Sequence, residues 1–411
     1  MLAFILRRLV KSGTLTVIRD NGQSFRVGDG TAPQVKIRVN RKVERSLLFR
    51  SPSLTIGEAY MDGDLIVEEG TIYDFLYLAT ANMSQGAEVW GARIRRSIGL
   101  LFRRAMQYNP ATRSRRNVAH HYDLSDTLYD LFLDKDRQYS CAYFRSPEDD
   151  IDTAQEQKKQ HIAAKLLIRP GDRILDIGSG WGGLALYLAS MTEGDVTGCT
   201  LSTEQHQVSQ RRAVENGVSE RVRFELRDYR ALDTEFDRIV SVGMFEHVGV
   251  GHYDQFFGKV RNLLKEDGVC LIHTIGRADG PGVTDPWVRK YIFPGGYVPA
   301  LSEVMPAIER QGLFTTDIEI LRLHYAETLK AWRARFMAAW DEVARLYDER
   351  FCRMWEFYLA GSEVAFRNMG LVVFQIQLAK QQDAVPLTRD YIVDWERTHS
   401  ASPSKSRAAA A

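Results

Sequence analysis

A glycine-rich stretch, RILDIGSGWGGLALYLA over residues 173–189, is the part of the sequence that most directly indicates chemistry. A β-strand is expected to end at Asp176, and an apolar helix is expected to begin near Leu184. Glycines at 178, 180, 182 and 183 let the backbone between them turn tightly and approach a ligand at the amino end of that helix. The pattern therefore predicts a loop that binds a cofactor.

A nicotinamide dinucleotide is one cofactor that such a loop could bind. Its binding calls for an acidic residue about 20 positions further on, at the end of the second strand, where it hydrogen-bonds the ribose. The second strand here ends in CTLS, with Thr200 and Ser202 in that place, and the nearest acids, Glu193 and Asp195, precede the strand. The sequence therefore disfavours nicotinamide binding.

Cys141 lies in the polar and aromatic stretch DRQYSCAYF, residues 136–144. A free cysteine in such a place is either a small buried core residue or a residue that lines a reaction site. The four cysteines, at 141, 199, 270 and 352, form no CxxC pair and no close Cys/His spacing, which argues against structural zinc and suits a reducing compartment. Residue types alone leave both interpretations of Cys141 open.

From about residue 160 the sequence alternates strand-like and helical segments, which predicts a parallel sheet with helices on both faces. The expected strands are 173–178, 195–201, 222–228, 236–243 and 268–276, and the expected helices between them are 183–190, 203–215 and 253–264. Aromatic residues at helical spacing predict a helix packed on the core or a pocket over 326–347. Strict alternation in VVFQIQLA predicts a late strand over 372–379.

Residues 1–88 are expected to form a small α+β domain. Asn21-Gly22, between two short alternating runs, predicts a β-hairpin over 14–28, and PQVKIRV predicts another strand over 33–39. The apolar run at residues 2–6 is too short for a secretory signal, and no stretch of about 18 apolar residues that could span a bilayer occurs. A cytoplasmic location is expected.

A basic linker is expected over residues 89–119, where no acidic residue occurs but eight arginines do, at 93, 95, 96, 103, 104, 113, 115 and 116. It is either a solvated connection between domains or a segment that rests on an anionic membrane. The whole chain carries 54 basic and 53 acidic side chains, which argues against a general nucleic-acid binder. The low-complexity tail over 396–411 is expected to be disordered.

Several motifs that follow one another in a fixed order carry a family resemblance. LDIGSGWGG, CTLSTEQ and RDYR together resemble S-adenosylmethionine-dependent methyltransferases. More narrowly, the chain resembles the cyclopropane-fatty-acyl-phospholipid synthase family, with the mycolic acid cyclopropane synthases as distant relatives. The blocks behind this narrower resemblance lie within residues 118–380 and include HHYDLSDTLYDLFLDKDRQYSCAYF, VGMFEHVG, LIHTIG, YIFPGGYVP, HYAETLKAW and GLVVFQIQLAK. A looser resemblance, in LTIGEAYMDG at 54–63, extends it to the N-terminal domain.

The resemblance implies a Rossmann-like class I methyltransferase sheet of seven mostly parallel strands, in a catalytic domain over 120–395, preceded by a lipid-associated N-terminal domain. It also implies that S-adenosylmethionine is the methyl donor. The residues implied to bind it are Tyr139, Ser140, Gly178, Ser179, Gly180, Trp181, Gly182, Thr200, Gln205, Asp228 and Tyr229. For Asp228 a helix N-cap, and for Tyr229 a core aromatic, are the structural alternatives.

Cyclopropanation adds a methylene across a cis double bond. The alkene attacks the activated methyl carbon, and the carbocation that results must lose a proton before the ring closes. The site must therefore exclude water, stabilise the cation and hold a base. The resemblance implies bicarbonate as that base, held by Cys141, Glu246, His273, the backbone of Ile275, and Tyr325. It favours the site-lining interpretation of Cys141, as a protonated weak donor.

The expected activity is therefore cyclopropane synthesis on unsaturated acyl chains of membrane phospholipids. The resemblance further implies a homo-oligomer, expected to be a dimer, and an enzyme bound peripherally to anionic lipid at the inner face of the membrane. One alternative is a relative that leaves a methyl branch or a methylene on the chain. Another is a lipid-binding scaffold with a vestigial fold, which the retained glycine loop argues against. Small-molecule or nucleic-acid methyltransferases share the fold. His120, His121 and His247 are expected to be structural, and no metal site is expected.

Overall fold

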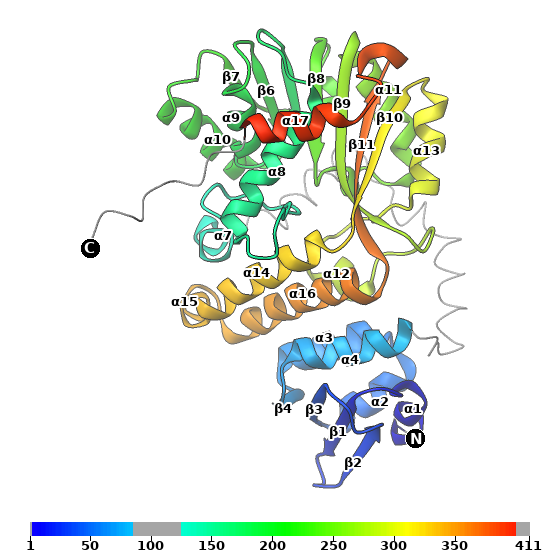
Figure 1. Ribbon diagram of the computed structural model, residues 1–411. Helices are drawn as coiled ribbons and strands as arrows, with labels where there is room; N and C mark the ends of the chain where they lie inside the picture. Colours follow the sequence, from blue (N-terminus) through cyan, green and yellow to red (C-terminus); the bar gives the residue numbers. More distant parts are fainter. Residues whose placement is uncertain (1, 85–124, 400–411) are drawn as a thin grey trace, which may run out of the picture.

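The computed structural model describes residues 2–84 and 125–399 as a small N-terminal α+β unit below a larger α/β unit (Figure 1). Within these residues, seven strands form the sheet of the larger unit, in the order β10-β11-β9-β8-β5-β6-β7. Six of them run in the same direction, and β11 lies antiparallel between β9 and β10. This arrangement confirms the expected fold class. The strands are β5 (Ile174–Ile177), β6 (Val196–Thr200), β7 (Val222–Leu226), β8 (Phe236–Val242), β9 (Leu264–Arg277), β10 (Phe314–Leu321) and β11 (Leu371–Ala379).

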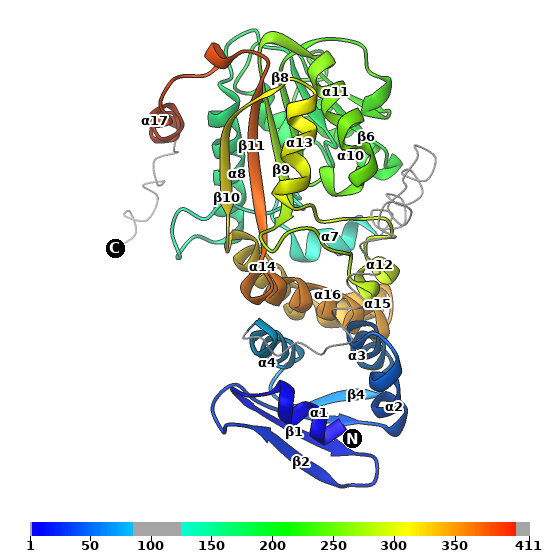
Figure 2. The ribbon, with the colours of Figure 1, turned by 90° about the vertical axis from the view of Figure 1, so that its right-hand side faces the viewer.

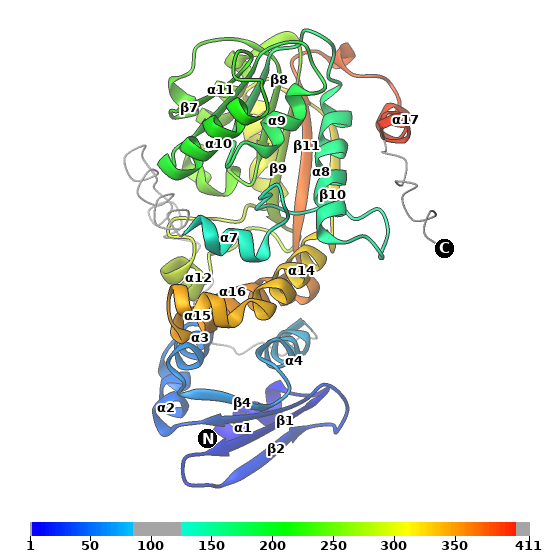
Figure 3. The same cartoon turned by 90° about the vertical axis from the view of Figure 1, so that its left-hand side faces the viewer.

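Helices cover both faces of this sheet. On one face, α8 (Ile151–Leu166), α9 (Gly183–Ala189) and α10 (Thr203–Glu215) share an apolar cluster with β5, β6 and β7 (Figure 3). On the other face, α11 (Tyr253–Leu263) and α13 (Leu301–Arg310) pack against β8, β9 and β11 (Figure 2). Burial of these apolar side chains is the main free-energy gain that holds the layers together.

A third group of helices lies beneath the carboxyl ends of the parallel strands. It comprises α7 (Asp126–Phe132), α12 (Pro286–Tyr291), α14 (His324–Ala338), α15 (Trp340–Leu346) and α16 (Glu349–Asn368). The helix predicted over 326–347 is therefore two helices, because the chain leaves the helical path at Ala339. Since ligands bind at the carboxyl edge of such sheets, this group is placed to close the site from below.

The N-terminal unit is a four-stranded sheet in the order β2-β1-β3-β4 with helices on it. Its elements are α1 (Leu2–Leu9), β1 (Thr14–Arg19), β2 (Ser24–Gly28), β3 (Gln34–Val39), α2 (Arg41–Phe49), α3 (Pro52–Asp62), β4 (Leu65–Glu69) and α4 (Ile72–Ser84). The predicted hairpin is confirmed, since β1 and β2 pair antiparallel around a turn in which Gly22 has φ +79°. The strand expected over 33–39 is also present, as β3, and pairs parallel with β1.

The two units meet along α16, which packs on α3 and α4 (Figure 1). The Tyr60 hydroxyl of α3 donates a 2.5 Å hydrogen bond to the buried carboxylate of Glu356, and the Arg353 guanidinium donates to the Met61 carbonyl at 3.0 Å. Gly57 allows the close approach of α12, because a Cβ there would lie 2.3 Å from the indole nitrogen of Trp287. The N-terminal unit is therefore fixed to a helix that also borders the catalytic side.

Two sequence predictions fall at the edges of the described chain. The basic linker over 89–119 lies outside the described residues, and so does the tail from residue 400. Residues 396–399, which were expected to be disordered, instead end the helix α17 (Asp390–His399), which packs on α8. Among the residues that the structure describes, no helix is long and apolar enough to cross a bilayer.

Replacement of Tyr60 by phenylalanine is expected to lower the free energy of unfolding of the full chain by about 1–3 kcal/mol, because a buried Glu356 carboxyl then loses its donor. Urea titration followed by circular dichroism measures the change. The matched control is Tyr77→Phe on α4, which is expected to stay within about 0.5 kcal/mol of the parent. Equal effects of the two substitutions would contradict the importance assigned to this hydrogen bond.

Candidate active site

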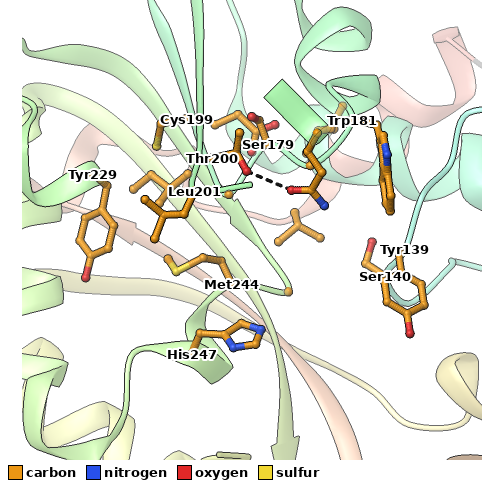
Figure 4. Close-up of a pocket in the computed structure, with 18 of the residues that line it drawn as sticks. Tyr139, Ser140, Ser179, Trp181, Cys199, Thr200, Leu201, Tyr229, Met244 and His247 are labelled. Atoms are coloured by element: carbon orange, nitrogen blue, oxygen red, sulfur yellow. Dashed lines mark hydrogen bonds between the residues drawn. The ribbon is translucent and has the colours of Figure 1, made fainter. Parts of the chain in front are cut away.

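One pocket lies at the carboxyl ends of β5, β6 and β8 (Figure 4). Its walls are the glycine loop after β5, the turn after β6, the turn after β7 and the segment 137–140, which precedes α8 in the chain. The structure brings ten of the eleven predicted cofactor residues to this pocket: Tyr139, Ser140, Gly178, Ser179, Gly180, Trp181, Thr200, Gln205, Asp228 and Tyr229. Side chains from four separate stretches of sequence thus face one ligand-sized space.

The glycine loop shows two different reasons for its glycines. Gly180 lines the pocket with φ +54°, and a Cβ built there would meet no atom within 4 Å, so the bare backbone borders open space. Gly182 has φ +83°, and its Cβ would lie 2.6 Å from the Phe224 ring. Gly182 caps α9 and is not among the residues that line the pocket, so its contact with the cofactor stays a prediction.

The turns after β6 and β7 are held by hydrogen bonds among predicted residues. The Thr200 hydroxyl donates to Gln205 Oε1 at 2.9 Å, drawn as the dashed line in Figure 4. The Asp228 carboxylate accepts from the backbone N–H of Arg230 at 3.0 Å, so the alternative N-cap role is real and coexists with its place in the pocket wall. Tyr229 likewise both packs on Phe256 and lines the pocket.

Two buried oxygen atoms in the pocket wall have no hydrogen-bond partner in the described part of the chain: Oδ2 of Asp176 and Oγ of Ser179. Burial raises the pKa of Asp176 to about 7, against the opposing charge of Lys158. Such orphaned acceptors are costly unless a ligand donates to them, so they fit a molecule with amino or hydroxyl groups, as S-adenosylmethionine has. Asp176 was not among the predicted contacts, although its position at the strand end, directly before the loop, was a usable signal.

Lys158 is a second residue that the sequence prediction missed. Its side chain is 0% exposed, and its ammonium donates to Gln138 Oε1 at 2.7 Å and to the Ser140 hydroxyl at 2.8 Å. One turn earlier, the Gln155 amide donates to the carbonyls of the same two residues. The segment 138–140 is therefore fixed to α8 by four hydrogen bonds, which no spacing in the sequence indicates.

Three of the residues expected to hold an anion, Glu246, His273 and Ile275, lie near the ends of the neighbouring strands β8 and β9. Ile275 N–H, near the end of β9, donates a 2.6 Å hydrogen bond to Glu246 Oε1. In the described chain, Glu246 Oε2 and His273 Nε2 are both buried without a hydrogen-bond partner. Burial raises the pKa of Glu246 to about 7 and lowers that of His273 well below its usual value. Below, "the cradle" denotes Cys141, Glu246, His273, Ile275 and Tyr325.

The other two residues of the cradle are Cys141, in the segment before α8, and Tyr325, on α14. Both belong, with Ile275, to one apolar cluster, and Cys141 is 1% exposed. The neighbouring Ala142 N–H donates to the Thr328 hydroxyl at 3.0 Å, which ties this segment to the helix α14 that carries Tyr325. Tyr325 is surrounded by aromatic rings, with its centroid 4.8 Å from that of Phe366 and 5.9 Å from that of Trp332. Trp332 also lies 5.2 Å, centroid to centroid, from Tyr139, so this buried aromatic part of the core reaches the pocket wall.

Comparison with known proteins bears on what this arrangement does. The sequence model of the mycolic acid cyclopropane synthetase family matches residues 109–376. The chain belongs to this family. A domain of unknown function matches residues 4–87. The cyclopropane-fatty-acyl-phospholipid synthase of Escherichia coli (strain K12) is 38% identical over 354 residues, which cover 86% of this chain and 89% of that protein. The expected family is therefore confirmed.

Two further relatives show how the family varies. The tuberculostearic acid methyltransferase UfaA1 of Mycobacterium tuberculosis (strain ATCC 25618 / H37Rv) is 33% identical over 391 residues, covering 92% of this chain and 90% of that protein. The crystal structure of the mycolic acid cyclopropane synthase CmaA1 with SAH and CTAB has a TM-score of 0.62 at 33% identity, covering 66% of this chain and 99% of that one. Family membership makes this chain an enzyme that uses S-adenosylmethionine.

His247, which was expected to be structural, has a place in the pocket wall. It lines the cofactor pocket, and burial lowers its pKa to about 4, so the imidazole there is neutral. Its ring lies 6.1 Å, centroid to centroid, from that of Phe293 (Figure 4 shows the imidazole). His120 and His121 lie outside the described residues. Within the described ranges, no group of three potential metal ligands is placed to bind an ion.

Cys141 in the native enzyme is expected to react with iodoacetamide at pH 7.5 at least about 100-fold more slowly than in the urea-unfolded chain. Burial raises the pKa of its thiol far above the usual range, and the thiolate is the reactive species. Peptide mass spectrometry over a time course measures the rate at this residue. Rapid native labelling with a low fitted pKa would contradict a protonated donor role.

Proposed function

We propose that this enzyme transfers a methylene from S-adenosylmethionine to the cis double bond of an unsaturated phospholipid acyl chain and closes a cyclopropane ring. One observation carries the proposal: the cofactor pocket and the cradle meet at consecutive residues. Tyr139 and Ser140 line the pocket, while Cys141 belongs to the buried cluster that contains Tyr325 and Ile275.

The aromatic surroundings suit the intermediate of this reaction. The carbon–carbon bond forms when the alkene π electrons attack the methyl carbon, which leaves S-adenosylhomocysteine and a carbocation. Ring faces stabilise such a cation, and an apolar enclosure excludes the water that would trap it. Tyr139 and Trp332, with ring centroids 5.2 Å apart, and the Tyr325 ring supply these faces. Loss of one proton then closes the ring.

The cradle also fits a bicarbonate ion, the base that family resemblance implies. Bicarbonate both donates and accepts hydrogen bonds, and the two orphaned atoms of the cradle match it: Glu246 Oε2 accepts, and a protonated His273 Nε2 donates. When bound, bicarbonate would supply the base that removes the proton. Ile275 N–H is already engaged by Glu246 Oε1, so its role here is to orient that carboxylate rather than to face the anion.

A methyl-branched or methylene-bearing product is the second candidate. It is favoured by the high coverage of the match to a tuberculostearic acid methyltransferase, which uses the same fold over nearly the whole chain. From the cation, loss of a proton of the added methyl group closes the ring, whereas loss of the hydrogen on the carbon that carries this methyl leaves a methyl-branched alkene. A methylene group needs a 1,2-hydride shift before the proton leaves, and a saturated methyl branch needs a hydride donor in addition. A well-placed base at the cradle favours loss of the proton that permits ring closure.

Incubation of the purified enzyme with S-adenosylmethionine, bicarbonate and vesicles of monounsaturated phospholipid is expected to add one CH2 per modified chain, with loss of the double bond and a cyclopropane signal in proton NMR. Glu246→Gln is expected to lower kcat at least about 100-fold, because the cradle loses its carboxylate. A gain of CH2 with surviving unsaturation would establish the second candidate instead. No transfer to lipid would overturn both.

We further infer that the enzyme acts as a homodimer bound peripherally to anionic phospholipid at the cytoplasmic face of the membrane. The helix α1 supports this inference in the described chain. Phe4 on α1 is 61% exposed, and the exposed Arg7 and Arg8 follow on the same short helix, with the Arg8 guanidinium 4.5 Å from the Phe4 ring centroid. An exposed aromatic beside basic groups is typical of a membrane-surface contact. The basic linker over 89–119 would add to it.

Replacement of both Arg7 and Arg8 by glutamine is expected to weaken co-sedimentation with anionic vesicles about tenfold or more, and to reduce its salt dependence. The pair Arg211→Gln and Arg223→Gln, two exposed arginines of the catalytic unit, carries the same charge change and is expected to have no effect. Equal losses for both pairs would contradict docking through α1. A loss confined to arginine replacements in 89–119 would assign docking to the linker.

A further inference from the structure

Gln375 lies at the centre of β11, on the face of the sheet turned toward α8. Val372, Phe374, Ile376 and Leu378 belong to the apolar cluster on the other face, so the alternate residues Gln375 and Gln377 point the opposite way. Their side chains are 0% and 1% exposed. Two buried amides on the central part of an otherwise apolar strand need a reason, because burial of an amide is costly unless it is hydrogen-bonded.

The reason differs between the two glutamines. Gln377 Nε2 donates to the Lys165 carbonyl at 2.6 Å and to the Tyr391 hydroxyl at 2.8 Å, which joins β11 to α8 and α17. Gln375 is paired across the sheet with His273 of β9, and its Nε2 lies 3.1 Å from His273 Nδ1. In the described chain, Gln375 Oε1 is buried without a partner. Gln377 thus links β11 to two helices. The side-chain hydrogen bond of Gln375, in contrast, goes to the imidazole of His273 in the cradle.

This contact fixes which nitrogen of His273 carries the proton. Burial, together with the positive charges of Lys158 and Lys165 on α8, keeps the imidazole neutral, so the ring holds a single N–H. Because the Gln375 amide donates to Nδ1, Nδ1 must be the acceptor and Nε2 must carry the hydrogen. That hydrogen is buried and has no acceptor among the described residues.

We propose that Gln375 is a positioning residue: its amide holds His273 as the Nε2–H tautomer, so that the imidazole donates to an anion in the cradle. The inference rests on the proposed function, since it assigns bicarbonate as that anion. With the opposite tautomer, the lone pair on Nε2 would face an oxygen of the anion and repel it, because the single O–H of bicarbonate donates to Glu246 Oε2. Gln375 therefore acts through His273 and touches neither lipid nor S-adenosylmethionine.

The tautomer is observable directly by NMR. Full-length enzyme labelled with 15N-histidine, compared with His273→Asn for assignment, is expected to show His273 with a protonated Nε2 and an unprotonated Nδ1 in the absence of substrate. Gln375→Met, which keeps the shape of the side chain but lacks the donor, is expected to lose that preference and populate Nδ1–H. A wild-type His273 protonated on Nδ1, or an unchanged ring in Gln375→Met, would overturn the proposal.

Kinetics supply the second readout, at fixed pH in buffers stripped of carbon dioxide. Gln375→Met is expected to raise the bicarbonate concentration for half-maximal rate about tenfold or more, with the KM for S-adenosylmethionine unchanged. Gln377→Met, the matched loss of a buried amide on the same strand, is expected to lower thermal stability but leave bicarbonate dependence intact. Equal shifts in both variants would mean a structural effect and overturn the proposal.

The two proposals fail in different ways. If the wild-type enzyme makes cyclopropane lipid without any dependence on bicarbonate, bicarbonate is not part of the proposed function. The role inferred for Gln375 would then be overturned as well. A bicarbonate-dependent wild type beside a Gln375→Met variant with normal bicarbonate dependence would overturn the role of Gln375 alone. A third result is also possible: the wild type transfers nothing to lipid, but it shows the Nε2–H tautomer and Gln375→Met loses it. That result would overturn the proposed function, while the effect of Gln375 on the His273 tautomer would stand.

Discussion

The buried ammonium group of Lys158 holds the segment on which both halves of the site depend. Its two hydrogen bonds to Gln138 and Ser140 fix a stretch of chain with no regular secondary structure. Burial lowers the pKa of Lys158 to about 8, against the attraction of Asp134. A charge is buried here at a cost that only good hydrogen bonds offset. Because these hydrogen bonds hold Gln138 and Ser140, the position of Cys141 relative to the wall of the cofactor pocket is fixed.

The helix α16 extends this constraint to the N-terminal unit. On one side it accepts the Tyr60 hydrogen bond, and on the other the Tyr358 hydroxyl lies 2.9 Å from the Tyr139 hydroxyl in the pocket wall. Glu356 and Tyr358 are only two residues apart on this helix. A force that displaces the N-terminal unit is therefore passed to the cofactor pocket through a rigid element rather than through a loop. The proposed lipid contact of the N-terminal unit and the cofactor pocket are therefore linked through this helix.

Much of the sheet was predictable because its parallel strands are short apolar runs separated by glycine turns and amphipathic helices. β10 escaped prediction because it is an edge strand of mixed composition, with Asp317 and Glu319 within it. α8 escaped for a different reason: 12 of its 16 residues are buried, and these include Lys158, His161 and Lys165, so no apolar stripe marks it as a core helix. The burial of these polar residues depends on tertiary hydrogen bonds, which cannot be seen in the sequence pattern.

The residues of the candidate site fall into the same two groups: those that the linear sequence indicates and those that depend on tertiary contacts. Residues in the glycine loop and at strand ends were identified, because the backbone geometry of this fold places them. Gly182, which was also assigned to the cofactor, packs against the Phe224 ring and caps α9, a role that only the structure reveals. Lys158 and Gln375 were missed because each acts on a residue of another segment, 18 to 102 positions away in sequence. The role of each residue comes from a hydrogen bond in the folded structure, and no local sequence motif indicates it.

Protonation states explain why a site of this kind would take its base from solution. Burial raises the pKa of the Cys141 thiol and of the Tyr139 hydroxyl far above neutrality, and that of Tyr358 to about 12. All three groups therefore stay protonated and are poor nucleophiles toward an activated methyl group or a carbocation. Glu246, the acid of the cradle, is held by Ile275 N–H. In the proposed reaction, bicarbonate rather than the Glu246 carboxylate would take the proton, and such an exchangeable anion would be replaced after each turnover.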